Sequence, residues 1–302
     1  AEYPSSADST EALMRCADMA MYRAKEKGRN NYQFFTETMQ SAAEAALSLE
    51  RQLRAAVDNK AFQLYYQPKI DIKTGKMAGA EALLRWQDET GTFISPEIFV
   101  AKLEELGLIN EVGNWVIDQV CIEACKIRDF LHQASPFTIA INLSMRQLAD
   151  PKIAKVLSNS LNAYDLNGQH IEVEVTESMM MGDPETTIGQ LNAINALGIT
   201  IAIDDFGTGY SSLGYLQDFP IDTLKIDKSF TQKIGQCNKS EKIVRTIVSL
   251  ALNLNLNIVA EGVETQQQLD YLRELQCDTI QGYFYSKPLP TRELMQLINK
   301  LW

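Results

Sequence analysis

From about residue 62 to the C-terminus, short apolar runs alternate with segments of helical periodicity. The runs are rich in β-branched residues, which predicts buried strands. Helices are predicted near residues 96–106, 110–133, 146–163, 184–197, 211–218, 239–254 and 265–275. Strands that alternate with helices form parallel sheets, and seven or eight strands in about 240 residues favour a closed (β/α)8 barrel over an open doubly wound sheet. No GxGxxG motif follows the first strand, so a dinucleotide-binding sheet is the less favoured alternative.

The first two strands of this region are predicted to run antiparallel. The segments FQLYYQPKID and KMAGAEALLRW flank the short polar stretch Lys73-Thr74-Gly75-Lys76, which is typical of a turn. Two strands joined by so short a connection form a hairpin. The predicted barrel therefore begins with one strand that opposes the direction of its neighbour.

The first 40 residues have a different pattern from the rest. STEALMRCADMAMYRAKEKGRN predicts an amphipathic helix that Gly28 stops, and NYQFF predicts one short strand. A lone helix and strand cannot form a core, so residues 1–40 are predicted to be the tail of an upstream domain plus a linker. The stretch TMQSAAEAALSLERQLRAAVDN predicts a further helix. This helix can link the tail to the main domain, predicted over residues 41–302, or serve as the first packed helix of that domain.

Polar residues recur at the ends of the strand-like runs. They are Glu81, Asn142, Glu174, Asp204 with Asp205, Lys225, Glu261 and Gln281. A parallel barrel or sheet gathers such strand ends on one face, where ligands bind. A single acid at the end of a strand is usually a helix N-cap or a solvated residue. Asp205 could be such an N-cap, and Asn142 could be a turn residue. However, Lys225 lies within an apolar strand, where its burial costs several kcal/mol unless it meets carboxylates. The recurrence therefore indicates one site dominated by carboxylates.

The chemistry of these side chains predicts a site for divalent cations. Carboxylate and amide oxygens without histidine or cysteine favour Mg²⁺ or Mn²⁺, with Ca²⁺ as a non-productive substitute. The period of two in a strand places Glu81 and Arg85 on one side, and predicts that Asp204 and Asp205 diverge at the end of theirs. Two ions about 4 Å apart would hold a phosphodiester between them and lower the pKa of a bound water.

Composition narrows the possible partners. The chain has 302 residues and a net charge of −11, which argues against a nucleic-acid polymer or an anionic membrane surface as partner. A small phosphorylated ligand remains compatible, because bound cations reverse the local sign of an acidic cluster. The five cysteines are scattered without a CxxC, which disfavours zinc and indicates reduced thiols. Neither a membrane-spanning run nor a signal-peptide pattern is present, so we expect this chain to be cytoplasmic, whether or not a longer protein is membrane-anchored.

The sequence resembles the EAL-domain family, bacterial phosphodiesterases that hydrolyse the second messenger cyclic di-GMP. The resemblance covers about residues 45–302 and rests on eight blocks in order. These are YQP at Tyr66–Pro68, EALLRW at Glu81–Trp86, INLS at Ile141–Ser144, EVTES at Glu174–Ser178, DDFGTGYSSL at Asp204–Leu213, LKIDKSF at Leu224–Phe230, AEGVET at Ala260–Thr265 and QGYFYSKPLP at Gln281–Pro290. It implies a modified (β/α)8 barrel whose first strand is antiparallel to the others, which agrees with the hairpin predicted above.

The resemblance also implies roles for individual residues. One ion would be held by Glu81, Asn142, Glu174 and Asp204, and the other by Asp204, Asp205 and Glu261. Lys225 would orient the attacking water, with Glu264 and Gln281 completing the shell around metal and water. Arg85 would hold a substrate phosphate, Gln67 and Pro68 would line the guanine pocket, and Asp205 and Gln281 would face the substrate. Glu177 would anchor the loop Asp205–Ser212, which in this family links dimer contacts to the active site.

Three functions follow from the resemblance. The first is hydrolysis of cyclic di-GMP to linear pGpG with two Mg²⁺ or Mn²⁺ ions, with Ca²⁺ inhibitory. The second is a receptor that binds cyclic di-GMP without turnover, and the third is an interaction module. The complete set of acids favours the enzyme, and a homodimer formed through the barrel is expected.

Residues 1–35 resemble the end of a GGDEF domain without its GG[DE]EF motif. Upstream GGDEF and sensor domains are therefore expected in a longer protein.

Overall fold

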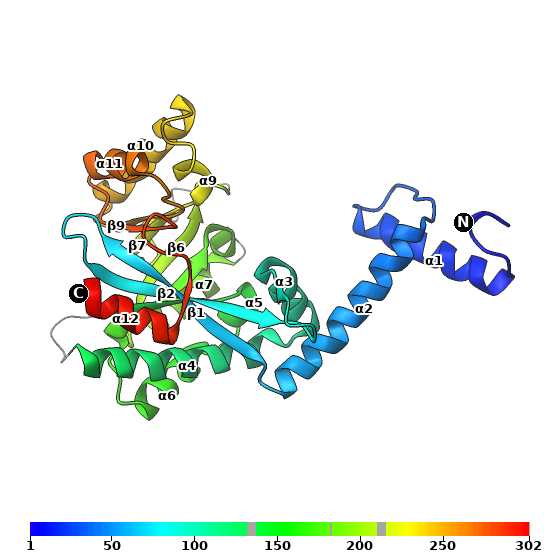
Figure 1. Ribbon diagram of the computed structural model, residues 1–302, viewed down its shortest axis with the longest axis horizontal. Helices are drawn as coiled ribbons and strands as arrows, with labels where there is room; N and C mark the ends of the chain where they lie inside the picture. Colours follow the sequence, from blue (N-terminus) through cyan, green and yellow to red (C-terminus); the bar gives the residue numbers. More distant parts are fainter. Residues whose placement is uncertain (132–136, 182, 210–215, 302) are drawn as a thin grey trace. The chain divides into compact units, whose positions relative to one another are not determined.

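The computed structural model describes residues 1–131, 137–181, 183–209 and 216–301 (Figure 1). Contacts divide the chain into two compact units. The smaller unit joins residues 1–61 to residues 87–106, and the larger joins residues 62–86 to residues 107–302. The predicted division into residues 1–40 and 41–302 separates two domain families, whereas the two units are defined by contacts. The predicted division therefore stays a prediction.

The smaller unit is mainly helical. Helix α1 (Thr10–Glu26) begins after the N-cap Ser9, whose hydroxyl accepts a hydrogen bond from the Ala12 amide. Helix α2 (Glu37–Asp58) contacts both α1 and α3 (Pro96–Leu106), and β3 (Phe93–Ile94) is a two-residue strand. The strand predicted for NYQFF is wrong, because residues 31–35 are assigned to no strand. A single extended segment needs a partner for its backbone hydrogen bonds, and sequence alone does not provide one.

The larger unit is a closed barrel. Its sheet runs in the order β1-β9-β8-β7-β6-β5-β4-β2, and β1 pairs again with β2 to close it. Strand β1 is antiparallel to β2 and β9, whereas the successive pairs from β2 through β9 are parallel. The predicted barrel with an antiparallel first strand is therefore confirmed. The strands are β1 (Phe62–Asp71), β2 (Met77–Gln87), β4 (Thr138–Asn142), β5 (Ile171–Thr176), β6 (Thr200–Phe206), β7 (Thr223–Ile226), β8 (Asn257–Ala260) and β9 (Thr279–Gln281), with β10 (Leu289–Pro290) added beside β1.

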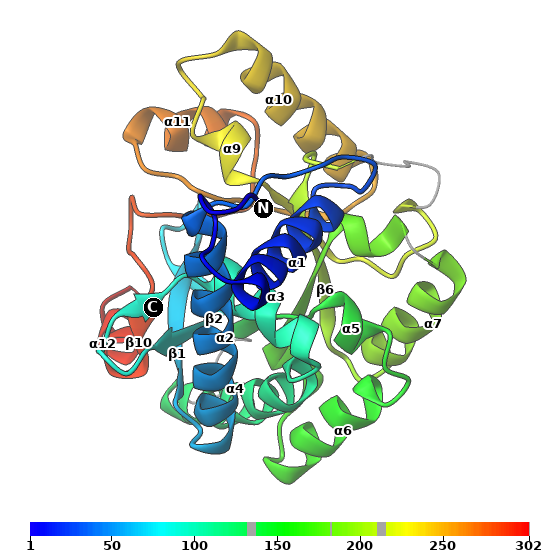
Figure 2. The same cartoon turned by 90° about the vertical axis from the view of Figure 1, so that its right-hand side faces the viewer.

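Helices surround these strands (Figure 2). They are α4 (Ile109–Phe130), α5 (Met145–Leu148), α6 (Ile153–Ala163), α7 (Pro184–Asn195), α9 (Lys228–Thr231), α10 (Asn238–Asn253), α11 (Gln266–Glu274) and α12 (Thr291–Leu301), with the short 3-10 helices η1 (Gly168–His170) and η2 (Glu177–Met181). The single helix predicted over residues 146–163 is instead two helices, because Pro151 lacks an amide donor and disfavours helical backbone before it. Most of the helix predicted over residues 211–218 lies outside the described residues.

The barrel has an apolar shell and a charged interior. Along β5, Val173 is fully buried, while the alternating Glu172 and Glu174 are also buried. Glu172 forms an ion pair with Lys69 of β1, a strand that is not adjacent to β5 in the sheet order, so this contact crosses the interior. Barrel interiors are usually filled by branched apolar side chains. The charged layer in this barrel departs from that pattern.

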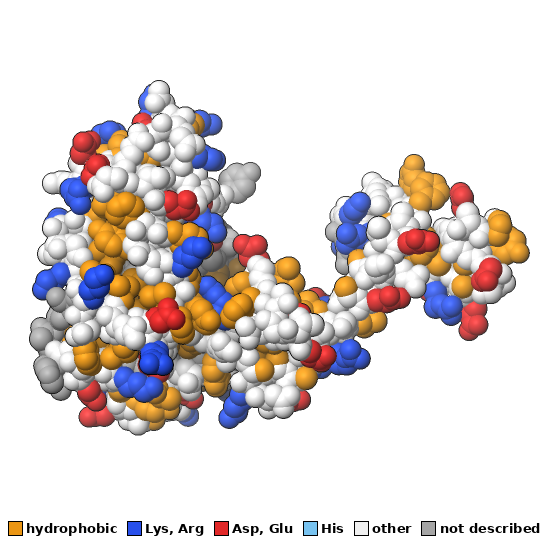
Figure 3. Space-filling model, viewed as in Figure 1, with side chains coloured by type: hydrophobic (Ala, Val, Ile, Leu, Met, Phe, Trp, Pro, Cys, Tyr) orange, Lys and Arg blue, Asp and Glu red, His pale blue; other side chains and the backbone are white. Residues whose placement is uncertain are grey.

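The outer surface differs from this interior. On the face shown in Figure 3, acidic and basic side chains of the larger unit are interspersed with apolar ones. Among the described residues, the helices are all too short or too polar to cross a membrane.

Candidate active site and metal centre

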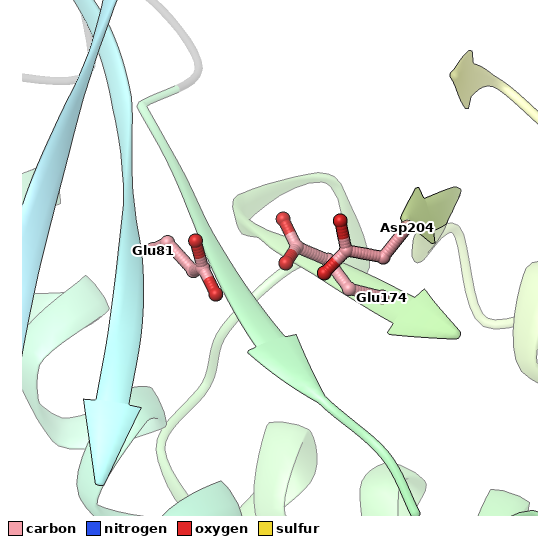
Figure 4. A group of neighbouring side chains, drawn as sticks. All are labelled: Glu81, Glu174 and Asp204. Atoms are coloured by element: carbon pink, nitrogen blue, oxygen red, sulfur yellow. The ribbon is translucent and has the colours of Figure 1, made fainter. Parts of the chain in front are cut away.

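Three carboxylates from three strands meet at the carboxyl end of the barrel. Glu81 of β2, Glu174 of β5 and Asp204 of β6 point toward one another (Figure 4), and each offers an oxygen within 4.8 Å of the others. A second such group consists of Asp204, Asp205 and Glu261, which follows β8. Asp204 belongs to both groups. The described residues therefore bring together the acids predicted to bind two ions and place Asp204 between the two sets.

Asp205 reaches the second group through an irregular backbone. The prediction that Asp204 and Asp205 diverge is wrong, because it assumed a regular strand. The pairing of β6 with β7 shifts between Ile203 and Phe206, and Asp205 has a φ of 55°, in the left-handed region. Aspartate tolerates this conformation better than most residues, and a bulge re-aims side chains near functional sites. The amide of Asp205 also donates to Asp204 Oδ1 at 2.9 Å.

Lys225 of β7 lies among these acids and is fully buried. Its Nζ is 2.6 Å from Glu174 Oε2 and 2.8 Å from Glu261 Oε1. It is also 3.1 Å from Asp204 Oδ1 and 3.6 Å from Glu81 Oε2. Burial alone would lower its pKa, but the four carboxylates outweigh burial and hold the pKa of Lys225 well above its usual value. The expectation that a lysine in an apolar strand must meet carboxylates is confirmed.

The acids of the cluster differ in how readily they ionise. Burial favours the neutral form of Glu174, but the attraction of Lys225 and Lys69 outweighs it and lowers the pKa of Glu174 to about 2. At Glu261, burial together with the charges of Asp204 and Glu81 outweighs Lys225 and raises the pKa to about 8. Burial and neighbouring acids also raise the pKa of Glu81 and of Asp205. The cluster holds more acids than Lys225 can balance, and Lys69 is shared between Glu174 and Glu172, so the cluster retains protons without added cations.

Cation binding is therefore expected to strengthen as the pH rises from about 6 to about 9. A carboxyl group with a raised pKa holds its proton below that pKa, and the ion must displace the proton before it can bind. Calorimetric titration with Mn²⁺ in two buffers of different protonation enthalpy would measure the protons released. We expect release to be largest at or below about pH 7 and to vanish well above pH 8. Affinity that stays constant over this range would contradict the expectation.

Two amides fix the carboxylate of Glu81. Asn142 Nδ2 donates to Glu81 Oε1 at 2.7 Å, and Gln281 Nε2 donates to Glu81 Oε2 at 2.6 Å. Gln281 Nε2 also lies 3.1 Å from Gln67 Oε1, and Gln67 Nε2 donates to the Ser286 carbonyl at 3.4 Å. Gln281 is 4% exposed, yet its Oε1 has no hydrogen-bond partner among the described residues. A buried acceptor of this kind is costly unless something donates to it or binds it.

The remaining predicted residues belong to neither carboxylate group. Arg85 of β2 is half-buried, donates to the Leu84 carbonyl at 2.9 Å and places its guanidinium carbon 5.8 Å from the centroid of the Tyr65 ring. Pro68 follows Gln67 in β1. Glu264 is exposed, accepts a hydrogen bond from Gln232 at 3.1 Å and belongs to neither carboxylate group. The predicted roles of these residues stay predictions.

Glu177 contacts the loop that follows β6. Its Oε2 accepts hydrogen bonds from the amides of Gly207 at 2.9 Å and Gly209 at 3.4 Å, and the residue is 5% exposed. Gly207 has a φ of 96°, a conformation that other residues adopt only with strain. The rest of the loop Asp205–Ser212, from residue 210, lies outside the described residues. Within the described part, Glu177 fixes the backbone two residues after the ligand candidate Asp205.

Glu177→Ala is expected to weaken cation binding about tenfold and to lower activity at limiting Mg²⁺. The substitution removes the acceptor of the two glycine amides, so the loop is no longer held in the geometry that places Asp205. Saturating Mg²⁺ should recover part of the activity, and thermal unfolding should change little. Glu185→Ala, which removes an exposed acid in the first turn of α7, is the matched control. Wild-type turnover of Glu177→Ala at limiting Mg²⁺ would show that other contacts hold the loop.

Sequence reasoning missed a second buried lysine. Lys69 of β1 is 6% exposed and contacts Glu172 and Glu174. The signal was the same one that identified Lys225. In QPKID, Lys69 precedes Ile70 within a strand whose residues 66–70 are all buried.

Sequence comparison matches residues 50–288 to the EAL domain. The chain belongs to the EAL domain family. The resemblance drawn from the eight motifs is therefore confirmed.

This EAL domain has curated relatives that are much longer than itself. Signaling protein YkoW of Bacillus subtilis is 42% identical over 293 residues, which cover 96% of this chain and 36% of YkoW. The bifunctional diguanylate cyclase/cyclic di-GMP phosphodiesterase MucR of Pseudomonas aeruginosa is 40% identical over 293 residues, which cover 97% of this chain and 42% of MucR. The EAL domain chain thus spans less than half the length of either relative.

The fold agrees with a solved structure. The structure described as PaMucR phosphodiesterase in complex with c-di-GMP superposes with a TM-score of 0.77 at 40% identity. The match covers 82% of this EAL domain chain and 99% of the solved chain.

Proposed function

We propose that this chain is a metal-dependent phosphodiesterase that hydrolyses cyclic di-GMP to linear pGpG. The observation that carries the proposal is the pair of carboxylate groups that share Asp204, with Lys225 buried between them. Such a site suits a phosphodiester, because two cations can neutralise its charge. Membership of the EAL domain family and similarity to MucR, which is named as a cyclic di-GMP phosphodiesterase, support the choice of substrate.

The residues present fit two Mg²⁺ or Mn²⁺ ions. The donor set consists of carboxylate and amide oxygens, which these hard cations prefer. Glu81, Asn142, Glu174 and Asp204 would hold one ion, and Asp204, Asp205 and Glu261 would hold the other. When bound, the ions would supply charge neutralisation and acidify a coordinated water. Ca²⁺ is expected to inhibit, because its longer and less directional bonds misplace the reacting groups.

The chain's own side chains would bind and orient the reactants. Lys225, which carries a full charge between the acids, would orient the attacking water. Arg85 would hold a phosphate, and Gln67 with Pro68 would line the guanine pocket. Gln281 would help to complete the shell around metal and water, and its Oε1 has no hydrogen-bond partner among the described residues. Glu264 would act from the outer part of the site, consistent with its exposed position.

The proposed reaction consumes one water for each bond broken. The water oxygen bonds to one phosphorus atom of the cyclic dinucleotide as one P–O bond to a ribose breaks. The released ribose oxygen takes up a proton, and the product is linear pGpG. Hydrolysis of a single linkage opens the ring without releasing a mononucleotide.

The direct test mixes the purified chain with cyclic di-GMP and Mg²⁺ and follows pGpG by chromatography. We expect pGpG with Mg²⁺ or Mn²⁺, and none after chelation or with Ca²⁺ alone. Binding of cyclic di-GMP without any pGpG would favour the receptor. Neither binding nor turnover would favour an interaction module and would contradict the proposal.

We further propose a homodimer formed through the barrel and a longer protein with GGDEF and sensor domains upstream. Support for the second point is that the chain spans 36–42% of YkoW and MucR, and that MucR is named as a bifunctional cyclase and phosphodiesterase. Sedimentation of the purified chain with and without cyclic di-GMP would test the dimer.

A further inference from the structure

The interior of the barrel holds charged residues to which the proposed reaction gives no task. Lys69 of β1, Glu172 of β5 and Thr223 of β7 are between 5% and 8% exposed. None of the three belongs to either carboxylate group that could hold a cation. Burying a lysine and a glutamate costs several kcal/mol unless they are well paired, and an apolar pair of similar volume often gives equal or greater stability. Stability is therefore a weak reason for this pair.

The contacts of Lys69 lead directly to a candidate metal ligand. Lys69 Nζ lies 2.6 Å from Glu172 Oε1 and 2.7 Å from Glu174 Oε1. The other oxygen of Glu172 accepts a hydrogen bond from the Thr223 hydroxyl at 3.0 Å. Glu172 is thus held at both oxygens, and it fixes the ammonium group that contacts Glu174.

The two oxygens of Glu174 have separate partners. Oε1 faces Lys69, whereas Oε2 is 2.6 Å from Lys225, which also contacts the other acids of the cluster. A carboxylate held at one oxygen cannot rotate freely about its last bond, so its other oxygen stays directed at the cluster. Partners of this kind orient a ligand, and their loss commonly costs tenfold to a hundredfold in metal affinity or activity.

We propose that Lys69, fixed by Glu172 and Thr223, is a positioning residue that holds Glu174 Oε1 and so presents Glu174 Oε2 to a divalent cation. The inference rests on the proposed function, because it takes Glu174 to be a metal ligand. Lys69, Glu172 and Thr223 thus support the two carboxylate groups without belonging to either of them, and the charges of Lys69 and Glu172 pair with each other. Lys225 faces the reacting groups, whereas Lys69 acts only through Glu174.

Charge and position predict opposite effects of removing Lys69. If Lys69 acted by charge alone, its removal would make the site more negative and cations would bind more tightly. If it acts by position, Glu174 keeps only the contact of its Oε2 with Lys225, its carboxylate is no longer fixed at Oε1, and cations bind more weakly. The sign of the change in affinity therefore separates the two roles.

The experiment compares three variants of the purified chain with the wild type by Mn²⁺ calorimetry and by thermal unfolding without cations. Lys69→Met leaves Glu172 buried without its cation and could impair folding. Lys69→Met/Glu172→Gln removes both charges, and the glutamine keeps an acceptor for Thr223, so this double variant should fold. The matched control is Lys73→Met, which alters an exposed lysine in the turn after β1, 3.8 Å from Asp278.

We expect the double variant to unfold within a few degrees of the wild type and to bind one Mn²⁺ at least about tenfold more weakly. Lys73→Met should match the wild type in both measurements. Wild-type or tighter Mn²⁺ binding by the double variant would overturn the positioning role while leaving the proposed function standing. A wild-type chain that binds no Mn²⁺ would overturn the proposed function and this inference together.

Discussion

Asp204→Asn is expected to lower the rate of cyclic di-GMP hydrolysis at least about a thousandfold, which corresponds to about 4 kcal/mol in the activation barrier. Asp204 is the acid common to both carboxylate groups, and asparagine keeps its shape but removes the charge that two cations would share. Loss of a charge at this place would affect both proposed cation sites at once, whereas loss of Glu81 or Glu261 would affect one.

The fold should survive this substitution. Asp204 is one of four acids around Lys225, and three remain to balance that lysine. The apolar alternation along β6, with Ile201 and Ile203 fully buried, is unchanged. Thermal unfolding without cations should therefore stay within a few degrees of the wild type. Asp218→Asn, at an exposed position between β6 and β7, is the matched control.

Chromatography of pGpG and Mn²⁺ calorimetry on the same samples check the expectation. Asp204→Asn should lose the two-ion binding isotherm together with turnover. Turnover near the wild-type level, or two Mn²⁺ ions bound with unchanged affinity, would contradict a bridging role for Asp204.

The barrel and the location of its site could be predicted because both follow from local patterns. Apolar runs that end in a polar residue identify the strands, and parallel pairing necessarily brings their ends together. The hairpin that makes β1 antiparallel follows from a four-residue turn between two strands. Lys225 was identified because a lysine within a buried strand needs carboxylates around it. These steps require no knowledge of which strands are neighbours.

Two features could not be predicted from regular alternation and local pattern. The resemblance placed Asp205 in the second carboxylate group, but regular alternation predicts the opposite direction for its side chain, and it fails here because a shift in strand register and a left-handed backbone interrupt β6. The contact between Lys69 and Glu172 joins residues 103 positions apart on strands that are not adjacent in the sheet. Local pattern identifies the strands that carry these two residues, but not that the residues meet. The strand predicted for residues 31–35 was wrong for a related reason. An extended segment forms a strand only when another segment pairs with its backbone, and sequence alone does not identify that segment.

Lys225→Met is expected to abolish turnover and to lower the free energy of unfolding of the cation-free chain by about 3–5 kcal/mol. The methionine fills a similar volume, so the packing of β7 between Leu224 and Ile226 is kept. What is lost is the cation that contacts Glu174, Glu261, Asp204 and Glu81. Without it, several buried carboxylates repel one another, and each must be ionised at a cost or protonated.

This cause predicts how pH and cations change the defect. Removing Lys225 raises the pKa of the surrounding acids in the folded state, so they take up protons as the pH falls and the destabilisation shrinks. Above those pKa values the acids are ionised, and the loss of stability should be largest at about pH 8 or higher. Added Mn²⁺ should raise the stability of Lys225→Met more than that of the wild type, because a divalent cation can replace the missing charge.

Urea unfolding at about pH 6 and about pH 8, with and without Mn²⁺, measures these effects on stability, and pGpG formation measures activity. Lys228→Met, an exposed lysine at the start of α9, should behave like the wild type. If Lys225→Met loses turnover but keeps wild-type stability at pH 8 without cations, the carboxylates do not depend on this lysine, and its role is confined to the attacking water. If Mn²⁺ restores stability but not turnover, the charge of Lys225 can be replaced by the ion while its position beside the water cannot.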